Sequence, residues 1–543
     1  MGEGVSAAPP TTHDPSLSPP PMPPTALVIG AGFGGLAAAA RLRARGYAVT
    51  VLDKQDQPGG RATVYRRDGF TFDAGPTVVT AHFLFDELFA LFGKRREDYV
   101  EFREVYPWYR IGFADGTYFN YGGTLEQTLD EIRKIEPADC DGYLRLLAHT
   151  KKIFDVGFTQ LGDRPFDTVW SMVKVSPQLM TLGTWRTVWQ MACKYIKNDK
   201  LRRVFSFQPL LVGGNPFNTT SIYSLIQYLE REWKVHFAMG GTGAIVSGIV
   251  KLLEEEGVTF RLGEEVEQIQ IKRGPTEAQH RAMFKMETGG TAPPERWRQQ
   301  GPHVDGVRVK GVGDLNADVV VCNADAPTVH KHLIAPEFRS NWPDKKIDNL
   351  RYSMGLFVWY FGTTKQYPDV AHHTILLGDR YAEHLKEMFD LKELALDDFS
   401  TYLHRPTATD PSMAPPGCDA FYVLCPVPNL QSDVDWKTMG PRYRDLILDD
   451  LERRHLPGLR ANLAVDFFVT PEHFRDNLNT LHGTGFSIQP TFGQSAYFRF
   501  HNRSGDIANL YFVGAGTHPG AGMPGVLCSA KVLEHVLPPA PKR

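Results

Sequence analysis

The sequence predicts an α/β protein that combines a Rossmann-type nucleotide-binding domain with a second domain of mixed sheet and helices. The first observation is an apolar strand at residues 25–29 that runs directly into a Gly-x-Gly-x-x-Gly motif. The second is another strand, at residues 48–53, that ends in an acidic residue. The third lies near the other end of the chain, where the strand 509–513 again runs into glycines and then a helix.

The first glycine motif has the arrangement of a dinucleotide-binding turn. Gly30 permits the tight turn, Gly32 lets a pyrophosphate approach the backbone, and Gly35 lets the next helix pack against the strand. That helix points unpaired N–H groups and a partial positive charge at the phosphates. Asp53 follows about 20 residues later, where a ribose hydroxyl needs an acceptor. A glycine-rich turn without a ligand is the alternative, and the complete order of these elements disfavours it.

The residues after Asp53 indicate which dinucleotide binds. Gly59 and Gly60 precede Arg61 at a point where an NAD domain would continue into another crossover helix. This arrangement lets the backbone and a guanidinium reach the far side of the pyrophosphate and a flavin. The arrangement resembles the glutathione-reductase-like fold of FAD proteins, and this resemblance implies FAD, and not NAD, bound non-covalently. An ordinary turn at the two glycines is the alternative.

Composition limits the classes of function. A chain of 543 residues is too long for one simple core, so two or more connected domains are expected. The 59 basic and 62 acidic residues give a net charge of −3, which offers no global electrostatic case for binding nucleic acid. Six scattered cysteines without a Cys-x-x-Cys pair predict reduced thiols in a cytosolic protein. No metal site is predicted, because neither histidine pair has a suitable ligand beside it; the pairs are His330 with His332 and His372 with His373.

The chain divides into segments of different composition. The Pro-rich residues 1–24 lack the features of a signal or transit peptide and are predicted to be disordered. Residues 137–239 are predicted to be helical and residues 331–505 to form the second domain, with buried antiparallel strands at 351–363 and 421–427. No apolar run is long enough to predict a membrane-spanning helix. The nucleotide-binding domain is predicted from three segments: 25–136, 240–330 with a polar loop at 272–303, and 506–543.

The second glycine-rich segment predicts another contact with the cofactor. Gly514 and Gly516 follow the strand, and Pro524 suits the first turn of the helix after them. The N-terminus of that helix can face negative charge that develops on a reduced flavin. A cofactor held between both ends of the chain accounts for both glycine motifs.

Several segments outside the first glycine motif carry a family resemblance. They are Asp68-Gly-Phe-Thr-Phe-Asp73-Ala-Gly75-Pro76-Thr, Leu210-Leu-Val-Gly-Gly-Asn215-Pro216-Phe, Tyr228-Leu-Glu-Arg-Glu-Trp233, Ala371-His-His-Thr, Tyr402-Leu-His, Phe474-Arg-Asp and, most specific, Gly514-Ala-Gly-Thr-His-Pro-Gly-Ala-Gly522. On these segments the chain resembles the bacterial-type phytoene desaturases of the carotenoid pathway, from about Thr25 to the final helix. Cys528 and Met523 depart from the family, which often has a glycine and a branched aliphatic residue at these positions. Relatives of this fold place the strand that resembles the one at Val266 beside the adenine.

The resemblance implies an FAD-dependent enzyme that introduces successive double bonds into phytoene and its desaturation intermediates, giving neurosporene or lycopene. Each step transfers a hydride to flavin and releases a proton, and a quinone or oxygen removes the electrons. A later-step desaturase, a ketolase, an isomerase or a non-catalytic prenyl-binding escort protein are the alternatives. The motifs identify no catalytic base. His518 is a candidate for a residue near the flavin, and a structural hydrogen bond is the alternative.

A substrate that is insoluble in water requires contact with a membrane lipid surface. Five apolar residues recur at three- and four-residue spacing and predict one face of a helix across 182–196; they are Leu182, Trp185, Trp189, Ala192 and Ile196. A basic cluster lies alongside and suits a helix in the headgroup zone; it comprises Arg186, Lys194, Lys197, Lys200, Arg202 and Arg203. A core-facing helix is the alternative. We expect a cytoplasmic protein that associates peripherally with membrane.

Overall fold

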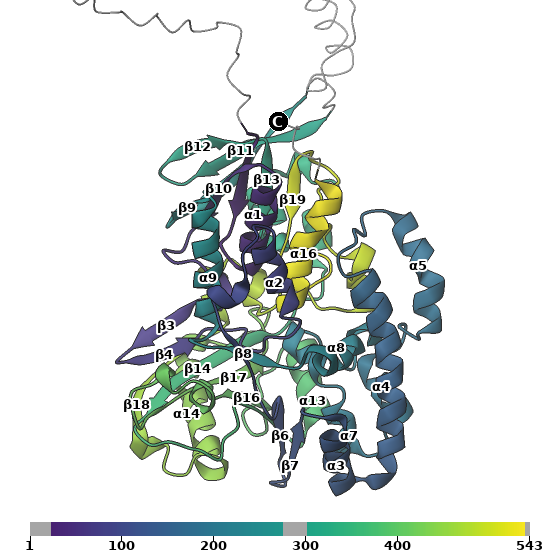
Figure 1. The fold of residues 1–543 in the computed structure, drawn as a ribbon, viewed down its shortest axis with the longest axis vertical. Helices are drawn as coiled ribbons and strands as arrows, with labels where there is room; N and C mark the ends of the chain where they lie inside the picture. Colours follow the sequence, from purple (N-terminus) through teal and green to yellow (C-terminus); the bar gives the residue numbers. More distant parts are fainter. Residues whose placement is uncertain (1–22, 275–300, 538–543) are drawn as a thin grey trace, which may run out of the picture.

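A five-stranded parallel sheet forms the core of one half of the molecule, called here the nucleotide-binding half (Figure 1). The computed structural model describes residues 23–274 and 301–537. The strand order is β19-β13-β1-β2-β9, so the chain contributes strands to this sheet from three separate segments. The strands are β1 (Thr25–Ile29), β2 (Ala48–Asp53), β9 (Thr259–Leu262), β13 (Val319–Cys322) and β19 (Leu510–Phe512).

Helix α1 (Phe33–Ala44) packs between α9 (Thr242–Glu255) and α16 (Met523–Val536). Its buried stretch runs through four consecutive alanines, 37–40, which are fully inaccessible. These small side chains let the neighbouring helix backbones approach closely. The first and last helices of the nucleotide-binding half therefore lie against each other (Figure 1).

A seven-stranded, mostly antiparallel sheet forms the second half, in the order β18-β14-β17-β16-β15-β6-β7. Strand β14 is buried over its whole length, as its aromatic and β-branched sequence predicts. Residues 357, 359 and 361 pack toward α14 (Trp436–Arg454), and those between them face the other core. The strands are β6 (Tyr109–Phe113), β7 (Tyr118–Tyr121), β14 (Gly355–Thr363), β15 (His373–Leu377), β16 (Thr401–His404), β17 (Asp419–Val427) and β18 (Leu463–Val469).

Strands β6 and β7 form a hairpin whose position differs from the domain boundary expected at residue 136. Strand β6 pairs in parallel with β15 of the second sheet. The first segment of the nucleotide-binding half thus ends before Tyr109, because this hairpin supplies an edge of the other sheet. Composition carried no signal for this exchange between halves.

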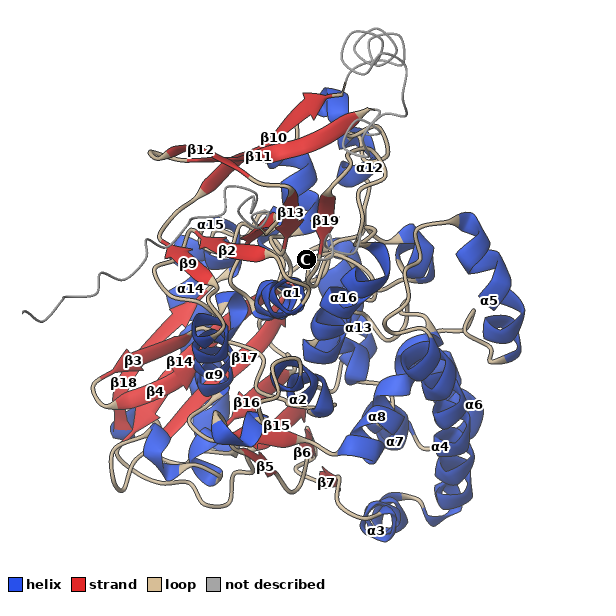
Figure 2. Cartoon of the chain, turned by 45° about the horizontal axis from the view of Figure 1, so that its top comes forward, coloured by secondary structure: helices blue, strands red, loops and turns tan. Residues whose placement is uncertain are grey.

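A group of helices lies at the side of the second sheet (Figure 2). The prediction of a single amphipathic helix across 182–196 is wrong. Helix α5 ends at Thr181, and α6 starts only at Val188, where Thr187 and Gln190 form a capping box. The helices are α3 (Leu125–Ile135), α4 (Cys140–Phe154), α5 (Val169–Thr181), α6 (Val188–Tyr195), α7 (Asp199–Val204) and α8 (Leu225–Trp233).

The predicted polar loop is narrower than 272–303, because β10 (Val266–Arg273) and β11 (Pro302–Val309) reach into it and pair with each other. Residues 275–300 and the predicted disordered tail up to residue 22 lie outside the described part of the chain. Within residues 23–274 and 301–537, no helix combines the length and apolar content needed to cross a bilayer. The remaining elements are α2 (Phe83–Ala90), β3 (Val64–Arg67), β4 (Phe70–Asp73), β5 (Phe102–Glu104), β8 (His236–Ala238), β12 (Gly313–Asn316), α11 (Ala326–Thr328), α12 (Asp344–Asp348), α13 (Tyr381–Lys386) and α15 (Pro471–Asp476).

Candidate active site

One cavity of about 540 Å³ extends from the turn after β1 to the inner face of the second sheet. It brings together most of the residues predicted to bind the cofactor. Gly35 and Gly516 do not line it. Those that line it are Gly30, Gly32, Asp53, Gly59, Gly60, Arg61, Val266, Gly514 and Pro524. Their individual contacts with FAD stay predictions, and the structure adds that they share one cavity.

Two glycines at the junction of β1 and α1 occupy positions that do not suit a larger residue. A Cβ atom on Gly35 would lie 1.9 Å from the carbonyl oxygen of Gly30, so only glycine allows the helix to pack against the turn. Gly30 itself has a φ of +97°, in the region that favours glycine. Gly516 plays a similar packing role, because its Cβ would lie 3.0 Å from the Oγ of Ser487.

Asp53 is held in place at the carboxyl end of β2. Its Oδ2 accepts a hydrogen bond from the N–H of Ala31 at 2.7 Å, and its Oδ1 accepts one from the N–H of Gln55 at 2.8 Å. Burial raises the pKa of this carboxyl, and the two backbone bonds oppose the shift. The carboxylate is therefore fixed at the sheet edge where open α/β sheets bind ligands.

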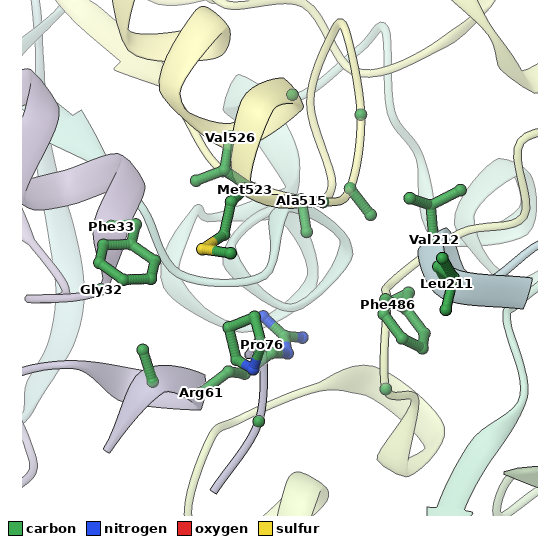
Figure 3. Close-up of a pocket in the computed structure, with 18 of the residues that line it drawn as sticks. Gly32, Phe33, Arg61, Pro76, Leu211, Val212, Phe486, Ala515, Met523 and Val526 are labelled. Carbon is green, nitrogen blue, oxygen red and sulfur yellow. The ribbon is translucent and has the colours of Figure 1, made fainter. Parts of the chain in front are cut away.

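Arg61 carries buried polar atoms that match an anionic ligand. Its Nε and Nη2 have no hydrogen-bond partner within the described chain. Burial lowers the pKa of the guanidinium, and the charge of Asp325 opposes this shift. Buried guanidinium donors are usually paired with carboxylate or phosphate oxygens. Arg61 and Pro76 face Ala515 and Met523 across the cavity (Figure 3). The residues present therefore fit a bound dinucleotide at this position.

The second glycine segment is held from behind by residues that the sequence did not single out. Buried Arg499 donates to the carbonyl oxygen of Ala515 at 2.6 Å and to that of Thr517 at 3.0 Å. Ser529 on α16 accepts a hydrogen bond from the N–H of Gly514 at 2.8 Å. An isolated arginine or serine carries no motif, so only the fold reveals this support.

His518 lines the cavity in the same segment. Its ring packs against Phe166 with the centroids 4.9 Å apart. Burial is the main cause that lowers the pKa of His518 to about 3, and the charge of Arg499 adds to it. Within the described residues neither ring nitrogen of His518 has a hydrogen-bond partner of good distance and angle, so its role near the flavin stays a prediction.

The opposite end of the cavity holds a buried carboxyl group among aromatic residues. Glu230 on α8 accepts a hydrogen bond from the hydroxyl of Tyr109 at 2.9 Å. Burial raises the pKa of Glu230 to about 8. Glu230 lies in a segment that carries the family resemblance, but its burial beside the cavity cannot be read from the sequence.

A hydrogen bond joins the second sheet to the segment after β4. Tyr422 donates it to the carbonyl oxygen of Gly75 at 3.2 Å.

The comparisons with known proteins agree with this geometry. A family model described as flavin containing amine oxidoreductase matches residues 33–531. The cyclohexylamine oxidase of Brevibacterium oxydans shares the fold, with a TM-score of 0.57 at 14% identity, over 95% of this chain and 98% of that one. Fold and site thus define an FAD-dependent oxidoreductase.

Two curated relatives narrow the class further. The chain is 44% identical over 512 residues to the lycopene-forming phytoene desaturase of Pseudescherichia vulneris, covering 94% of this chain and 98% of the relative. It is 41% identical over 522 residues to the neurosporene-forming phytoene desaturase of Rhodobacter capsulatus, covering 95% and 94%. The chain belongs to the phytoene desaturase branch of the flavin-containing amine oxidoreductase family.

Proposed function

We propose that this chain uses FAD to desaturate phytoene to neurosporene or lycopene. The main observation that supports this proposal is one cavity that is lined by the glycine turns, by Arg61 and by a group of apolar residues. An apolar lining suits a hydrocarbon chain, which has no polar group to recognise. The names of the two relatives support this substrate. The apolar region is lined by Phe207, Leu210, Leu211, Leu356, Ile375, Leu377 and Leu424.

The chain's own residues would position the substrate and exclude water. Desaturation removes a hydride and a proton from adjacent carbons, and bound FAD would supply the hydride acceptor. The apolar walls hold the hydrocarbon in one orientation in a dry site. The N-terminus of α16 lies at the cavity, with Gly522 before its first turn and Pro524 in it. Its free N–H groups favour negative charge on that side.

The proposal is tested by supplying phytoene in liposomes to the purified, flavin-loaded protein and separating the products by chromatography. Neurosporene or lycopene is the expected product. An oxygenated product would indicate a ketolase, and a product of unchanged mass would indicate an isomerase. Unchanged phytoene with a folded, flavin-loaded protein would contradict the proposal and favour a prenyl-binding escort. Parallel reactions with quinone under argon, or in air without quinone, identify the electron acceptor.

A bulky residue in the apolar region should block the substrate but not the cofactor. Leu377 is buried at the end of β15 and lines the cavity. We expect Leu377→Trp to lower phytoene conversion by at least about a hundredfold, because misplacing the reacting carbons forfeits their alignment. Flavin content should stay at the wild-type level. Leu391→Trp, at an exposed leucine, is the control, and equal activity of the two variants would contradict the assigned substrate region.

We further propose that α5 and the turn after it contact a membrane surface. Of the residues expected to form that contact, Leu182, Ala192 and Ile196 are buried in the core, so the core-facing alternative holds for them. Trp189 packs against Phe217. The basic cluster is partly engaged elsewhere: Lys200 pairs with Asp115, and Arg203 pairs with Asp199.

The exposed apolar surface instead lies one element earlier. Helix α5 stands at the margin of the molecule (Figure 2). Its Leu179 lines the cavity, so the same helix borders both the substrate region and the outside. Lys174 is exposed on it, and a basic residue near anionic lipid contributes about 1 kcal/mol. The exposed apolar residues, called here the α5 patch, are Val169, Trp170, Val173, Met180 and Trp185.

Two charges in the α5 patch should weaken membrane binding. We expect the double variant Trp170→Asp, Trp185→Asp to lower co-sedimentation with anionic liposomes about tenfold or more, because two interfacial aromatic residues are replaced by repelled carboxylates. FAD content should not change, since the nucleotide-binding half lies elsewhere. Leu391→Asp, an exposed apolar position outside the patch, is the matched control. Unchanged liposome binding of the folded double variant would exclude the patch as the contact.

A further inference from the structure

Three buried histidines meet at the junction of β15 and β16, outside the predicted cofactor site. His372 precedes β15, His373 begins it, and His404 ends β16, directly opposite His373 in the strand register. The ring centroids are 4.4 Å apart for His372 and His373, 4.9 Å for His372 and His404, and 5.3 Å for His373 and His404. One ring nitrogen from each lies within 4.8 Å of one from each of the others. We call this group the histidine cluster.

The hydrogen bonds of the cluster leave the inner ring nitrogens free. The Nδ1 of His372 is bonded to the hydroxyl of Thr409 at 2.6 Å, and the Nδ1 of His373 to the hydroxyl of Tyr402 at 2.6 Å. Within the described residues, the Nε2 atoms of both rings have no partner, and neither has either ring nitrogen of His404. Buried ring nitrogens without partners are rare in folded proteins unless a water or an ion lies between them.

A carboxylate completes the pattern. The Oδ2 of buried Asp73 lies 4.0 Å from the Nε2 of His404 and also lacks a hydrogen-bond partner within the described chain. Histidines that bind metals use one ring nitrogen for the ion and direct the other to a hydroxyl, carbonyl or carboxylate. Each ring of the histidine cluster has such an outer partner in place or nearby.

We propose that His372, His373 and His404 bind a divalent transition-metal ion of the zinc type, with Thr409, Tyr402 and Asp73 as their outer partners. In this arrangement the ion contacts the Nε2 atoms of His372 and His373 and the Nδ1 of His404. Three imidazoles are a nitrogen donor set that suits zinc and its first-row neighbours.

The position of the cluster gives the ion a structural role. Strands β15 and β16 carry Ile375, Leu377, Thr401 and Tyr402, which all line the cavity. An ion between the ends of the two strands would fix their relative position, and with it the cavity wall that Tyr402 completes. The sequence predicted no metal because the third histidine comes from a different strand, which only the sheet register brings alongside.

Metal analysis of protein purified without a metal-affinity step tests the proposal. After dialysis against a weak chelator, we expect about one zinc-type ion per chain by mass spectrometry. His404→Gln should lower this content at least about tenfold. Thr409→Val keeps all three ligands but removes the partner of His372, and should weaken metal affinity by about 10- to 100-fold. His384→Gln, at a buried histidine on α13 outside the cluster, should retain the ion.

A second measurement does not depend on the folding of variants. Wild-type protein stripped of metal should regain thermal stability on addition of Zn²⁺, and Co²⁺ should give the visible absorption of a low-coordinate nitrogen site. Less than about one ion per ten chains in folded wild type, with neither effect on adding metal, would overturn the proposal. The cluster would then be a neutral polar network that holds water.

Discussion

A Gly32→Trp variant is expected to fold but to purify without flavin colour, with FAD content lowered by more than about tenfold. A Cβ atom at this position would lie 3.0 Å from the Nδ2 of Asn323 and 3.7 Å from the carbonyl oxygen of Gly59. A larger side chain can extend only into the cavity, where the pyrophosphate is predicted to approach the backbone. The ratio of visible flavin absorbance to protein concentration measures the loss.

Gly493 offers a matched control for this substitution. A Cβ atom there meets nothing within 4 Å, and the backbone does not need glycine. Gly493→Trp should therefore retain full flavin content. A Gly32→Trp protein as yellow as the control would place the cofactor elsewhere than on the first glycine turn.

Glu230→Gln should remove one large contribution to the pH dependence of stability; another comes from Asp73, because burial raises the pKa of that carboxyl to about 7. Burial raises the pKa of this carboxyl from 4.5 to about 8 in the folded chain. Between these values the folded state keeps a proton that the unfolded state loses, so stability falls as pH rises through this window. The shift corresponds to roughly 5 kcal/mol between pH 4.5 and pH 8, as an order of magnitude. The amide of glutamine does not titrate and can still accept the hydrogen bond from Tyr109.

Thermal unfolding measured at several pH values between 4.5 and 8 checks this expectation. The wild-type midpoint should fall as pH rises, and the Glu230→Gln midpoint should change less. Glu126→Gln, at an exposed surface glutamate, should follow the wild type. Parallel curves for wild type and Glu230→Gln would mean that the carboxyl is ionised in the folded protein.

Much of the nucleotide-binding half was predictable from sequence because its physics is local. Gly30 and Gly35 are required by contacts between residues that are close in the chain. The strands before them are short apolar runs with clear boundaries. Strand β14 was predictable from its continuous apolar sequence, because a strand buried on both faces has apolar residues at every position.

The rest depended on contacts between residues far apart in sequence. Arg499 supports the second glycine segment, and His404 joins two histidines from another strand, yet neither has a local motif. The periodicity across 182–196 was real, but a capped turn at Thr187 divides it, and most of the stripe faces the core. Periodicity reports which side chains share an apolar environment and does not tell whether that environment is protein or lipid.

Because three separate segments of the chain contribute strands to the parallel sheet, the order of synthesis determines when the cofactor site can form. Strand β19 pairs with β13, and α16 follows it as the last helix, so both leave the ribosome after every other element. Domains generally assemble in the direction of synthesis, but here the two glycine segments cannot face each other until the final helix has packed against α1. Flavin capture is therefore expected only after α16 has been synthesised and has packed against α1.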